Sequence, residues 1–269
     1  MAKKILFINQ EITPYVPETT MSLLGRDVPQ KIQEKVYEIR TFMPKWGNIN
    51  ERRGQLHEVI RLSGMNLIID DTDHPLIIKV ASIPTSRLQV YFIDNEDYFM
   101  RRPMMTANEN GEEYDDNGER AIFFARGVLE TVKKLRWIPD VILCQVWMSS
   151  VIPFYIKTAY KEEPCFANTK VITSIFAEQM KKTLDANFKK CLAFREAKEE
   201  MLTTYNDEFN YLELGKMAID FSDGIIVAEE NANAELVGYA KETNKPVLDG
   251  SKTDAEEVYS TFFDQIAGE

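Results

Sequence analysis

Residues 3–9 form a continuous apolar segment with the sequence Lys-Lys-Ile-Leu-Phe-Ile-Asn, bounded by polar side chains. A strand that is buried on both faces has this pattern, because neither face can carry polar residues. A loop with prolines follows, and a helical pattern begins near Pro29, where proline suits the first helical turn. Residues 36–42 return as a second strand, which ends at Pro44. A strand, a helix and a strand in this order form a βαβ unit, so we expect a parallel sheet.

The remaining chain continues to alternate between strand and helix patterns. Short β-branched runs, which predict a small antiparallel hairpin region beside the parallel sheet, occupy residues 58–62, 67–69, 76–81 and 88–93. Further strands are expected at 141–144, 171–175, 224–228 and 245–249, and helices at 119–136, 151–160 and 231–241. Residues 175–204 have apolar side chains at near-helical spacing, which predicts a long amphipathic helix or a helix pair. The acidic stretch 93–120 is expected to be a surface loop.

The last residues have the pattern of a helix that docks on the rest of the molecule. The sequence Thr-Asp-Ala-Glu from Thr253 predicts a capping box, and Val258, Phe262 and Ile266 follow at helical spacing. We therefore predict an α/β fold, doubly wound around a mostly parallel Rossmann-like sheet, over residues 1–250. A C-terminal amphipathic helix within residues 251–269 is expected to pack on that domain.

Composition excludes several classes of function. The chain has 32 basic and 43 acidic residues and a formal net charge of −11, which repels phosphate backbones and anionic lipid. We therefore expect neither nucleic-acid nor membrane binding. Three scattered cysteines and two histidines suit neither a disulfide framework nor a zinc site, so no metal or other cofactor is expected. The absence of a signal-peptide core and of a long apolar run predicts a cytoplasmic protein.

Five groups of residues occur in an order that resembles one known family. They are Lys4-Ile-Leu-Phe with Glu11, Pro14, Val28-Pro29 and Phe42-Met43-Pro44; Tyr91–Asp94 with Tyr98, Phe99 and Arg101; Tyr114, Asp116-Asn117, Glu119-Arg120, Phe123-Phe124 and Leu129-Glu130; Trp137, Pro139–Ile142, Trp147 and Pro153; and, more weakly, Leu214, Ile219, Asp223-Gly224 and Val227. In this order they resemble the N-terminal half of bacterial glycogen and starch synthases. That resemblance implies one half of a GT-B glycosyltransferase, a family that transfers glucose from ADP-glucose to the non-reducing end of an α-1,4-glucan. It makes α-glucan and ADP-glucose the expected ligands.

The sequence departs from this family where the chemistry is expected. The family's loop Lys-Thr-Gly-Gly-Leu-Gly-Asp aligns with residues 17–23, which contain no glycine and begin with Pro17 and Glu18. Glycines there allow the backbone to approach a phosphate, whereas a carboxylate repels it. The two histidine positions of the family's His-x-His-Asp-Trp motif are Leu143 and Gln145, and its aspartate is Val146. A glutamine cannot take up a proton, so the sequence identifies no residue that would act as the catalytic acid or base.

The resemblance places a set of candidate residues at the substrate cleft: Glu11, Tyr15, Asp116, Asn117, Arg120, Gln145 and Trp147. Each has a structural alternative. Asn117 at a helix N-cap, with Glu119 and Arg120 in the first turn, is an alternative to a sugar site. Glu11 lies where ligands bind in open α/β sheets, or it is a buried carboxylate that holds the next loop.

The aromatic and histidine candidates also have two interpretations. Trp147, Tyr15 and Tyr98 form either a sugar-stacking platform or part of the core. The segment Asp71-Thr-Asp-His74 suits a cation site in principle, but surface-turn chemistry explains it better.

Two functions follow from these observations. The first is a glycogen or starch synthase-like protein that is truncated to its N-terminal domain and catalytically impaired, or dependent on a partner. That partner is a separate chain with the family's nucleotide domain, or a second copy of this chain. The alternative is a non-catalytic scaffold that binds glucan or protein. An unrelated small-molecule enzyme on the same fold rests on fold analogy alone.

Overall fold

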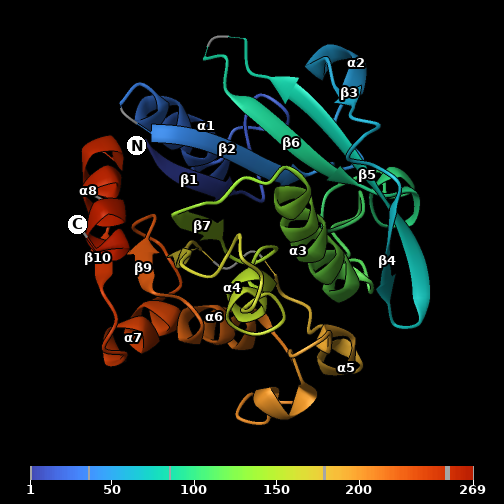
Figure 1. Ribbon diagram of the computed structural model, residues 1–269. Helices are drawn as coiled ribbons and strands as arrows, with labels where there is room; N and C mark the ends of the chain where they lie inside the picture. The colour runs from blue at the N-terminus through green and yellow to red at the C-terminus, as the bar shows by residue number, and fades with distance from the viewer. Residues whose placement is uncertain (1, 36, 85, 178–179, 252–254, 269) are drawn as a thin grey trace.

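A single ten-stranded sheet runs through the described residues, which are 2–35, 37–84, 86–177, 180–251 and 255–268 of this computed structural model (Figure 1). The strands are β1 (Lys3–Ile8), β2 (Tyr37–Pro44), β3 (His57–Glu58), β4 (Met65–Ile69), β5 (Thr72–Ser82), β6 (Gln89–Asp94), β7 (Val141–Gln145), β8 (Lys170–Ile175), β9 (Gly224–Val227) and β10 (Val247–Asp249). Their order is β10-β9-β8-β7-β1-β2-β6-β5-β3, and β4 pairs with β5. All pairs from β10 to β6 are parallel, and β3, β4 and β6 pair with β5 in antiparallel fashion. The mostly parallel, doubly wound α/β fold is thus confirmed.

Helices cover both faces of the sheet. They are α1 (Thr20–Gln33), α2 (Glu51–Gly54), the π-helical turn η1 (Glu96–Met100), α3 (Asn117–Lys134), α4 (Val151–Lys157), α5 (Phe188–Leu192), the 3₁₀ turn η2 (Glu199–Leu202), α6 (Tyr211–Asp220), α7 (Ala234–Glu242) and α8 (Ala255–Ala267). Helices α1 and α8 contact each other on one side, and α3, α4 and α6 form the layer on the other side (Figure 1).

Strand β1 shows why the sheet is buried on both faces. Ile5 and Phe7 belong to the core under α1 and α8, whereas Leu6 and Ile8 belong to the core under α3 and α4. Successive side chains of a strand point to opposite faces, so a strand between two helical layers must be apolar at every position. The continuous apolar run at residues 5–8 is therefore explained by burial of β1 on both faces, as the sequence predicted.

Helix α1 begins earlier than the sequence indicates. It starts at Thr20, and Pro29 lies inside it instead of at its first turn. A proline has no N–H, so the carbonyl four residues earlier, that of Gly25, loses its helical donor. The side-chain amide of Asn9 donates to that carbonyl over 3.3 Å, which satisfies it and ties the helix to the end of β1.

The prediction of a long amphipathic helix or a helix pair over residues 175–204 is wrong. The described part of this segment contains only α5 and η2 between turns and irregular backbone. Its backbone donors bond elsewhere: the N–H groups of Lys181 and Lys182 donate to the Glu113 carboxylate, and that of Leu184 donates to the carbonyl of Phe209. The apolar side chains are nevertheless buried, because an irregular chain can also place every third or fourth side chain against a core.

The antiparallel region beside the parallel sheet is present, but its first run is shorter than expected. Only His57–Glu58 forms a strand, since the chain turns at Val59 and Leu62. The segment 93–120 is not simply a surface loop, because it contains η1, whose Tyr98 and Phe99 are buried. Helix α6 is an element that the sequence pattern did not reveal.

Helix α8 lies against the sheet through Phe262, Phe263 and Ile266 of the expected tail pattern and through Tyr259, whereas Val258 is outside this cluster. Tyr259, Phe262, Phe263 and Ile266 pack on residues of β1, β7, β8 and β9. The capping box expected at Thr253 lies outside the described residues. None of the helices in the described ranges has the length and apolar character that a membrane crossing needs.

Candidate functional site

Polar side chains collect where the central parallel strands end. Asn9, Gln10 and Glu11 follow β1, and Gln145 and Ser174 lie at the ends of β7 and β8. All five are almost completely buried. The carboxyl ends of the strands are the place where open α/β sheets bind ligands. We therefore take this edge as the candidate functional site.

The side-chain amide of Gln145 is hydrogen-bonded to backbone groups at both ends. Its Oε1 accepts a hydrogen bond from the Gln10 N–H over 3.0 Å, and its Nε2 donates to the Met21 carbonyl over 3.2 Å. The side chain thus joins β7 to the loop after β1 and to α1. An amide in this position orients backbone but neither accepts nor delivers a proton.

Gln10 extends the same network to the segment after β7. Its Oε1 accepts from the N–H groups of Trp147 and Met148, over 3.4 and 3.2 Å, and its carbonyl accepts from the Trp46 indole over 2.8 Å. Trp147 itself is fully buried, so it offers no exposed face for a sugar to stack on.

Residues 17–23 contain the N-cap and the first turn of α1, and Thr19 and Ser22 form a capping box there. The Thr19 hydroxyl accepts from the Ser22 N–H over 3.0 Å, and the Ser22 hydroxyl accepts from the Thr19 N–H over 2.8 Å. The Thr19 hydroxyl also donates to the Glu11 carboxylate over 2.7 Å. The Ser22 N–H in the first turn of α1 is therefore bonded by a side chain of the protein, at a helix N-terminus of the kind that can bind an anion.

Glu11 adds a negative charge to this cap. Burial raises the pKa of Glu11, and the hydrogen bonds from Thr19 and Gln10 oppose that shift. The backbone of Glu11 is also packed tightly on α1: a Cβ on Gly25 would lie 2.4 Å from the Glu11 carbonyl oxygen. Glycine is required at position 25 by this close approach, which holds the backbone of Glu11 against α1.

The candidates at the start of α3 bond neighbouring segments of the chain. Asn117 is the first residue of α3, and Asp116 occupies the N-cap position without a side-chain cap bond. This corrects the expectation that Asn117 is the cap. Asp116 pairs with Arg102, while the Asn117 amide donates to the Thr106 carbonyl over 2.8 Å and accepts from Arg120.

Arg120 is fully buried, and its guanidinium bonds only inward. It donates to the carbonyl groups of Tyr98 and Met105 as well as to the Asn117 side chain, over 2.7–2.8 Å. Burial lowers the pKa of Arg120 to about 10. These contacts fix the segment between η1 and α3, so the described structure gives Arg120 a packing role.

Tyr98 and His74 form a buried polar pair, which is a correction to the expected surface turn. His74 lies within β5, and its Nε2 is 2.9 Å from the Tyr98 hydroxyl, which donates to the Glu119 carboxylate over 2.5 Å. Burial lowers the pKa of His74. Across the described ranges, no three His, Cys, Asp or Glu side chains gather in a way that could hold a metal ion.

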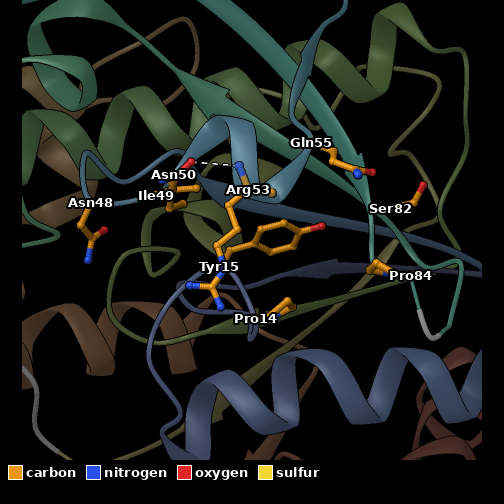
Figure 2. A pocket seen from close by; sticks show the side chains of 10 residues that line it. Pro14, Tyr15, Asn48, Ile49, Asn50, Arg53, Gln55, Ser82 and Pro84 are labelled. Atoms are coloured by element: carbon orange, nitrogen blue, oxygen red, sulfur yellow. Dashed lines mark hydrogen bonds between the residues drawn. The ribbon is translucent and has the colours of Figure 1, made fainter.

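Tyr15 differs from the other aromatic candidates because it lines a cavity. Its ring packs edge-on against Phe92, with ring centroids 4.9 Å apart, and its hydroxyl is buried without a hydrogen-bond partner among the described residues. Burial raises the pKa of Tyr15 to about 12, so the hydroxyl stays neutral. The cavity has a volume of about 240 Å³ and lies between the loop after β1, α2 and the end of β5 (Figure 2).

Beneath α2 lies an ionic network that the sequence analysis missed. The Glu51 carboxylate pairs with Lys45 over 2.9 Å and with Lys79 over 2.7 Å, and Lys79 pairs with the fully buried Asp94 over 2.8 Å. A lysine inside the apolar run 76–81 and an aspartate at the end of the next strand were the available signal. Paired burial is what makes such charges tolerable inside a sheet.

Comparison with solved structures defines the class of protein. The catalytic domain of starch synthase IV from Arabidopsis thaliana, solved with ADP and acarbose, matches with a TM-score of 0.74 at 15% identity. The match covers 95% of this chain and 53% of that one. The fold is therefore one Rossmann-like half of the GT-B type, as the resemblance implied.

Comparison of sequences defines the family. The family model described as "Starch synthase catalytic domain" matches residues 4–248. Glycogen synthase from Chlorobium phaeobacteroides is 33% identical over 260 residues, which cover 95% of this chain and 48% of that protein. Glycogen synthase from Chlorobium limicola is 37% identical over 172 residues, which cover 64% and 35%. The chain belongs to the starch synthase catalytic domain family and spans about half, or less, of the length of these relatives.

Proposed function

We propose that this chain, by itself, does not transfer glucose from ADP-glucose and serves instead as a non-catalytic binding scaffold built on the family's fold. The observation that supports the proposal best is the closed cap at the start of α1. There the Thr19 hydroxyl bonds both the Ser22 N–H and the Glu11 carboxylate.

The argument from charge concerns the leaving group. Transfer of glucose from ADP-glucose releases ADP. The negative charge on its diphosphate grows in the transition state and needs fixed positive charges or N–H donors. Loss of one such donor typically costs about 10²–10³ in rate. At this position the chain offers the exposed Glu18, whose carboxylate repels an anion, and Pro17 in place of the family's lysine.

The argument from proton transfer concerns Gln145, which stands at a histidine position of the family's motif. Both ends of its amide are bonded to backbone groups of Gln10 and Met21. Rotating the amide toward a substrate would break two buried hydrogen bonds, each worth about 1 kcal/mol. The side chain therefore supports the fold at this point.

The direct test is an assay for ADP release from ADP-glucose with glycogen as the acceptor. Glycogen synthase from Chlorobium limicola serves as the positive control under the same conditions. We expect the purified chain to release no ADP above the rate of the protein-free blank. Release that depends on glycogen and increases in proportion to the concentration of this chain would contradict the proposal.

A second arm of the assay separates the scaffold from a partner-dependent enzyme. The C-terminal half of the Chlorobium limicola protein is added to the chain before the substrates. We expect no activity beyond that of the added half alone. Activity that appears only with both chains present would replace the scaffold with an enzyme assembled from two chains.

The remaining expectations concern ligand and compartment. Among the family's substrates, α-glucan remains compatible with the scaffold, because its binding does not need the phosphate site. A cytoplasmic location is favoured by three cysteines that are all free, since disulfides form mainly in oxidising compartments.

A further inference from the structure

Another cavity lies between the β4–β5 hairpin and α5, next to α3. Helix α3 contacts both β4 and α5, so three separate parts of the chain meet there (Figure 1). The cavity has a volume of about 370 Å³, which is within the ~300–1,000 Å³ of small-molecule pockets. Its lining includes Ile68, Asp70 and Asp71 of the hairpin, Arg126 of α3, and Lys190 and Phe194 from α5 and the residues after it.

Arg126 is a buried cation for which the described part of the chain supplies no anion. The residue is 7% exposed, and no carboxylate in the described ranges forms an ion pair with it. Its guanidinium donates to the Ile68 carbonyl and lies over the Phe194 ring, 3.8 Å from the centroid. These contacts compensate the charge only in part, because a buried charge without a counter-charge costs free energy. A carboxylate from outside the chain would supply the missing counter-charge.

One nitrogen of this guanidinium is open to the cavity. Nη1 donates to the Ile68 carbonyl, and Nε is enclosed by the protein without a hydrogen-bond partner among the described residues. Nη2 also lacks a partner in those residues, but it is not one of the enclosed side-chain atoms, and Arg126 lines the cavity. A ligand in the cavity can therefore reach Nη2. Charge-assisted hydrogen bonds from a guanidinium to a carboxylate are among the strongest that proteins make.

A second arginine on the same aromatic ring shows what Arg126 lacks. The Arg195 guanidinium lies 5.0 Å from the Phe194 centroid, and it pairs with Glu163 over 2.7 Å and with Glu130 over 3.8 Å. The protein thus supplies two carboxylates to the more exposed arginine and, among the described residues, none to the buried one. The two side chains share a ring and differ in whether the fold provides the anion.

The other charges of the lining limit the ligand to one negative charge. Lys190 and Asp70 pair with each other over 3.5 Å, so they largely offset one another. Asp71 is exposed, and solvent screens its charge, whereas the buried Arg126 acts in a lower dielectric. A second negative charge on the ligand would meet these two carboxylates. The exposed Ile68 and the half-buried Phe194 offer apolar surface for the rest of the ligand.

We propose that this cavity binds a small monocarboxylate with an apolar body. The carboxylate pairs with Arg126 through Nη2, and the body lies on Ile68 and Phe194. Dicarboxylates and inorganic phosphate bind less well, because they carry more charge and no apolar surface that matches these side chains. None of the lining residues belongs to the group at the strand ends, so this site and the absence of glucose transfer are independent proposals, and either can fail alone.

The test is a calorimetric titration of the full chain with phenylacetate, phenylacetamide and inorganic phosphate. Phenylacetamide has the shape of phenylacetate without its charge, and phosphate has the charge without an apolar body. We expect saturable, millimolar binding of phenylacetate and at least fivefold weaker binding of each of the other two. Equal affinity for the acid and the amide would overturn the proposal, as would tighter binding of phosphate or no binding of phenylacetate at about 20 mM.

A pair of arginine variants locates the carboxylate. Arg126→Met keeps most of the side-chain volume and removes the guanidinium, so the preference for phenylacetate over phenylacetamide should disappear. Arg195→Met is the matched control, because it removes an arginine from the same ring whose charge is already paired. It should keep the preference of the parent chain within twofold. An unchanged preference in Arg126→Met would overturn the proposal.

A second pair of variants tests the apolar wall and does not disturb a buried charge. Ile68→Ala should weaken phenylacetate binding at least threefold, and because Ile68 is 57% exposed, the variant should fold like the parent chain. Ile60→Ala changes an isoleucine that is 82% exposed and does not line the cavity, so its affinity should stay within twofold of the parent. If Arg126→Met does not fold, equal affinities of Ile68→Ala and Ile60→Ala would overturn the proposal.

Discussion

At the scale of single residues, the polar side chains at the end of β1 divide into two kinds. Gln10, Glu11 and Gln145 hydrogen-bond one another's segments and the start of α1. Tyr15 keeps a buried hydroxyl with no partner among the described residues and lines a cavity. The first kind joins β1, β7 and α1, and the second leaves a buried polar group unsatisfied at some cost in stability.

Tyr15→Phe is expected to stabilise the protein. It removes a buried hydroxyl that has no described partner, and relief of such a group is worth about 1 kcal/mol. Tyr155→Phe is the matched control, because the buried Tyr155 hydroxyl donates to the Leu192 carbonyl over 2.9 Å and its loss should cost about 1 kcal/mol. Urea unfolding measures both, and a clear loss of stability in Tyr15→Phe would show that its hydroxyl is well bonded in solution.

His74 is expected to make stability depend on pH. Burial lowers its folded-state pKa below the ordinary value of 6.5, although the carboxylates of Glu119, Asp97 and Asp73 oppose the shift. A depressed histidine pKa means that the neutral ring stabilises the fold above about pH 6.5 and that this contribution is lost as the pH falls through the folded-state pKa.

The measurement is the free energy of unfolding from pH 7.5 to about pH 5 for three chains. The parent chain should lose more stability across this range than His74→Gln does. His57→Gln, which changes the exposed histidine of β3, should follow the parent curve. Parallel curves for the parent and His74→Gln would refute a lowered pKa at position 74.

At the scale of elements, α1 shows how side chains decide the position and the chemistry of a helix. Its start is set by the Thr19 and Ser22 cap, and its interior proline is tolerated because Asn9 bonds the Gly25 carbonyl. The same contacts that define the helix join it to β1 and fill its N-terminus. The contacts that define the start of the helix are thus also the contacts on which the proposed loss of a phosphate site rests.

Thr19→Ala is expected to lower the free energy of unfolding by about 1–2 kcal/mol, the usual cost of losing an N-cap. It also leaves the Glu11 carboxylate without its hydroxyl donor. Thr20→Ala is the control, since the adjacent Thr20 is exposed and its side chain makes no hydrogen bond with the described residues. Equal stabilities of the two variants, measured by chemical denaturation, would count against the cap.

The sequence was informative where burial is complete and less so where contacts are distant. The parallel strands and α3 follow from periodicity, because both faces or one stripe must be apolar. The position of Pro29 inside α1 could not be predicted, since it depends on Asn9 reaching the Gly25 carbonyl. The helix expected over 175–204 fails because Glu113 and Phe209 take its backbone donors, and these partners are remote in sequence.

The candidate site was predictable in place but not in role. Glu11 was identified from its position after a strand, Gln145 from the family's histidine motif and Tyr15 as an aromatic candidate, and all three lie at or beside the carboxyl edge of the sheet. Only coordinates reveal that Arg120 and Trp147 are fully buried. The cavity itself combines residues from three separated segments, so no local pattern could reveal it.

At the scale of the whole molecule, α8 closes the face of the sheet that α1 leaves open. Phe263 is fully buried and packs against Phe7 of β1, with ring centroids 6.0 Å apart. Near the other end of the strand, Lys3 pairs with Asp264 over 2.6 Å. Residues beyond the family match at 248 therefore complete the core.

Phe263→Ala is expected to cost about 3–5 kcal/mol, as for other large aromatic side chains removed from cores. Gln265→Ala, an exposed position on the same helix, should change the free energy of unfolding by less than about 0.5 kcal/mol. Circular dichroism and tryptophan fluorescence should give one coincident transition for the parent chain. Loss of α8 in a separate, earlier transition would show that it is not part of the cooperative unit.

The most direct test of the closed phosphate site is a calorimetric titration of the parent chain with ADP and with ADP-glucose. We expect no saturable heat at ligand concentrations of about 1 mM, where a working nucleotide-sugar site would be occupied. Saturable binding of ADP that is weakened by Thr19→Ala and unaffected by Tyr15→Phe would contradict the conclusion, because it would place a diphosphate at the cap that Glu11, Thr19 and Ser22 close.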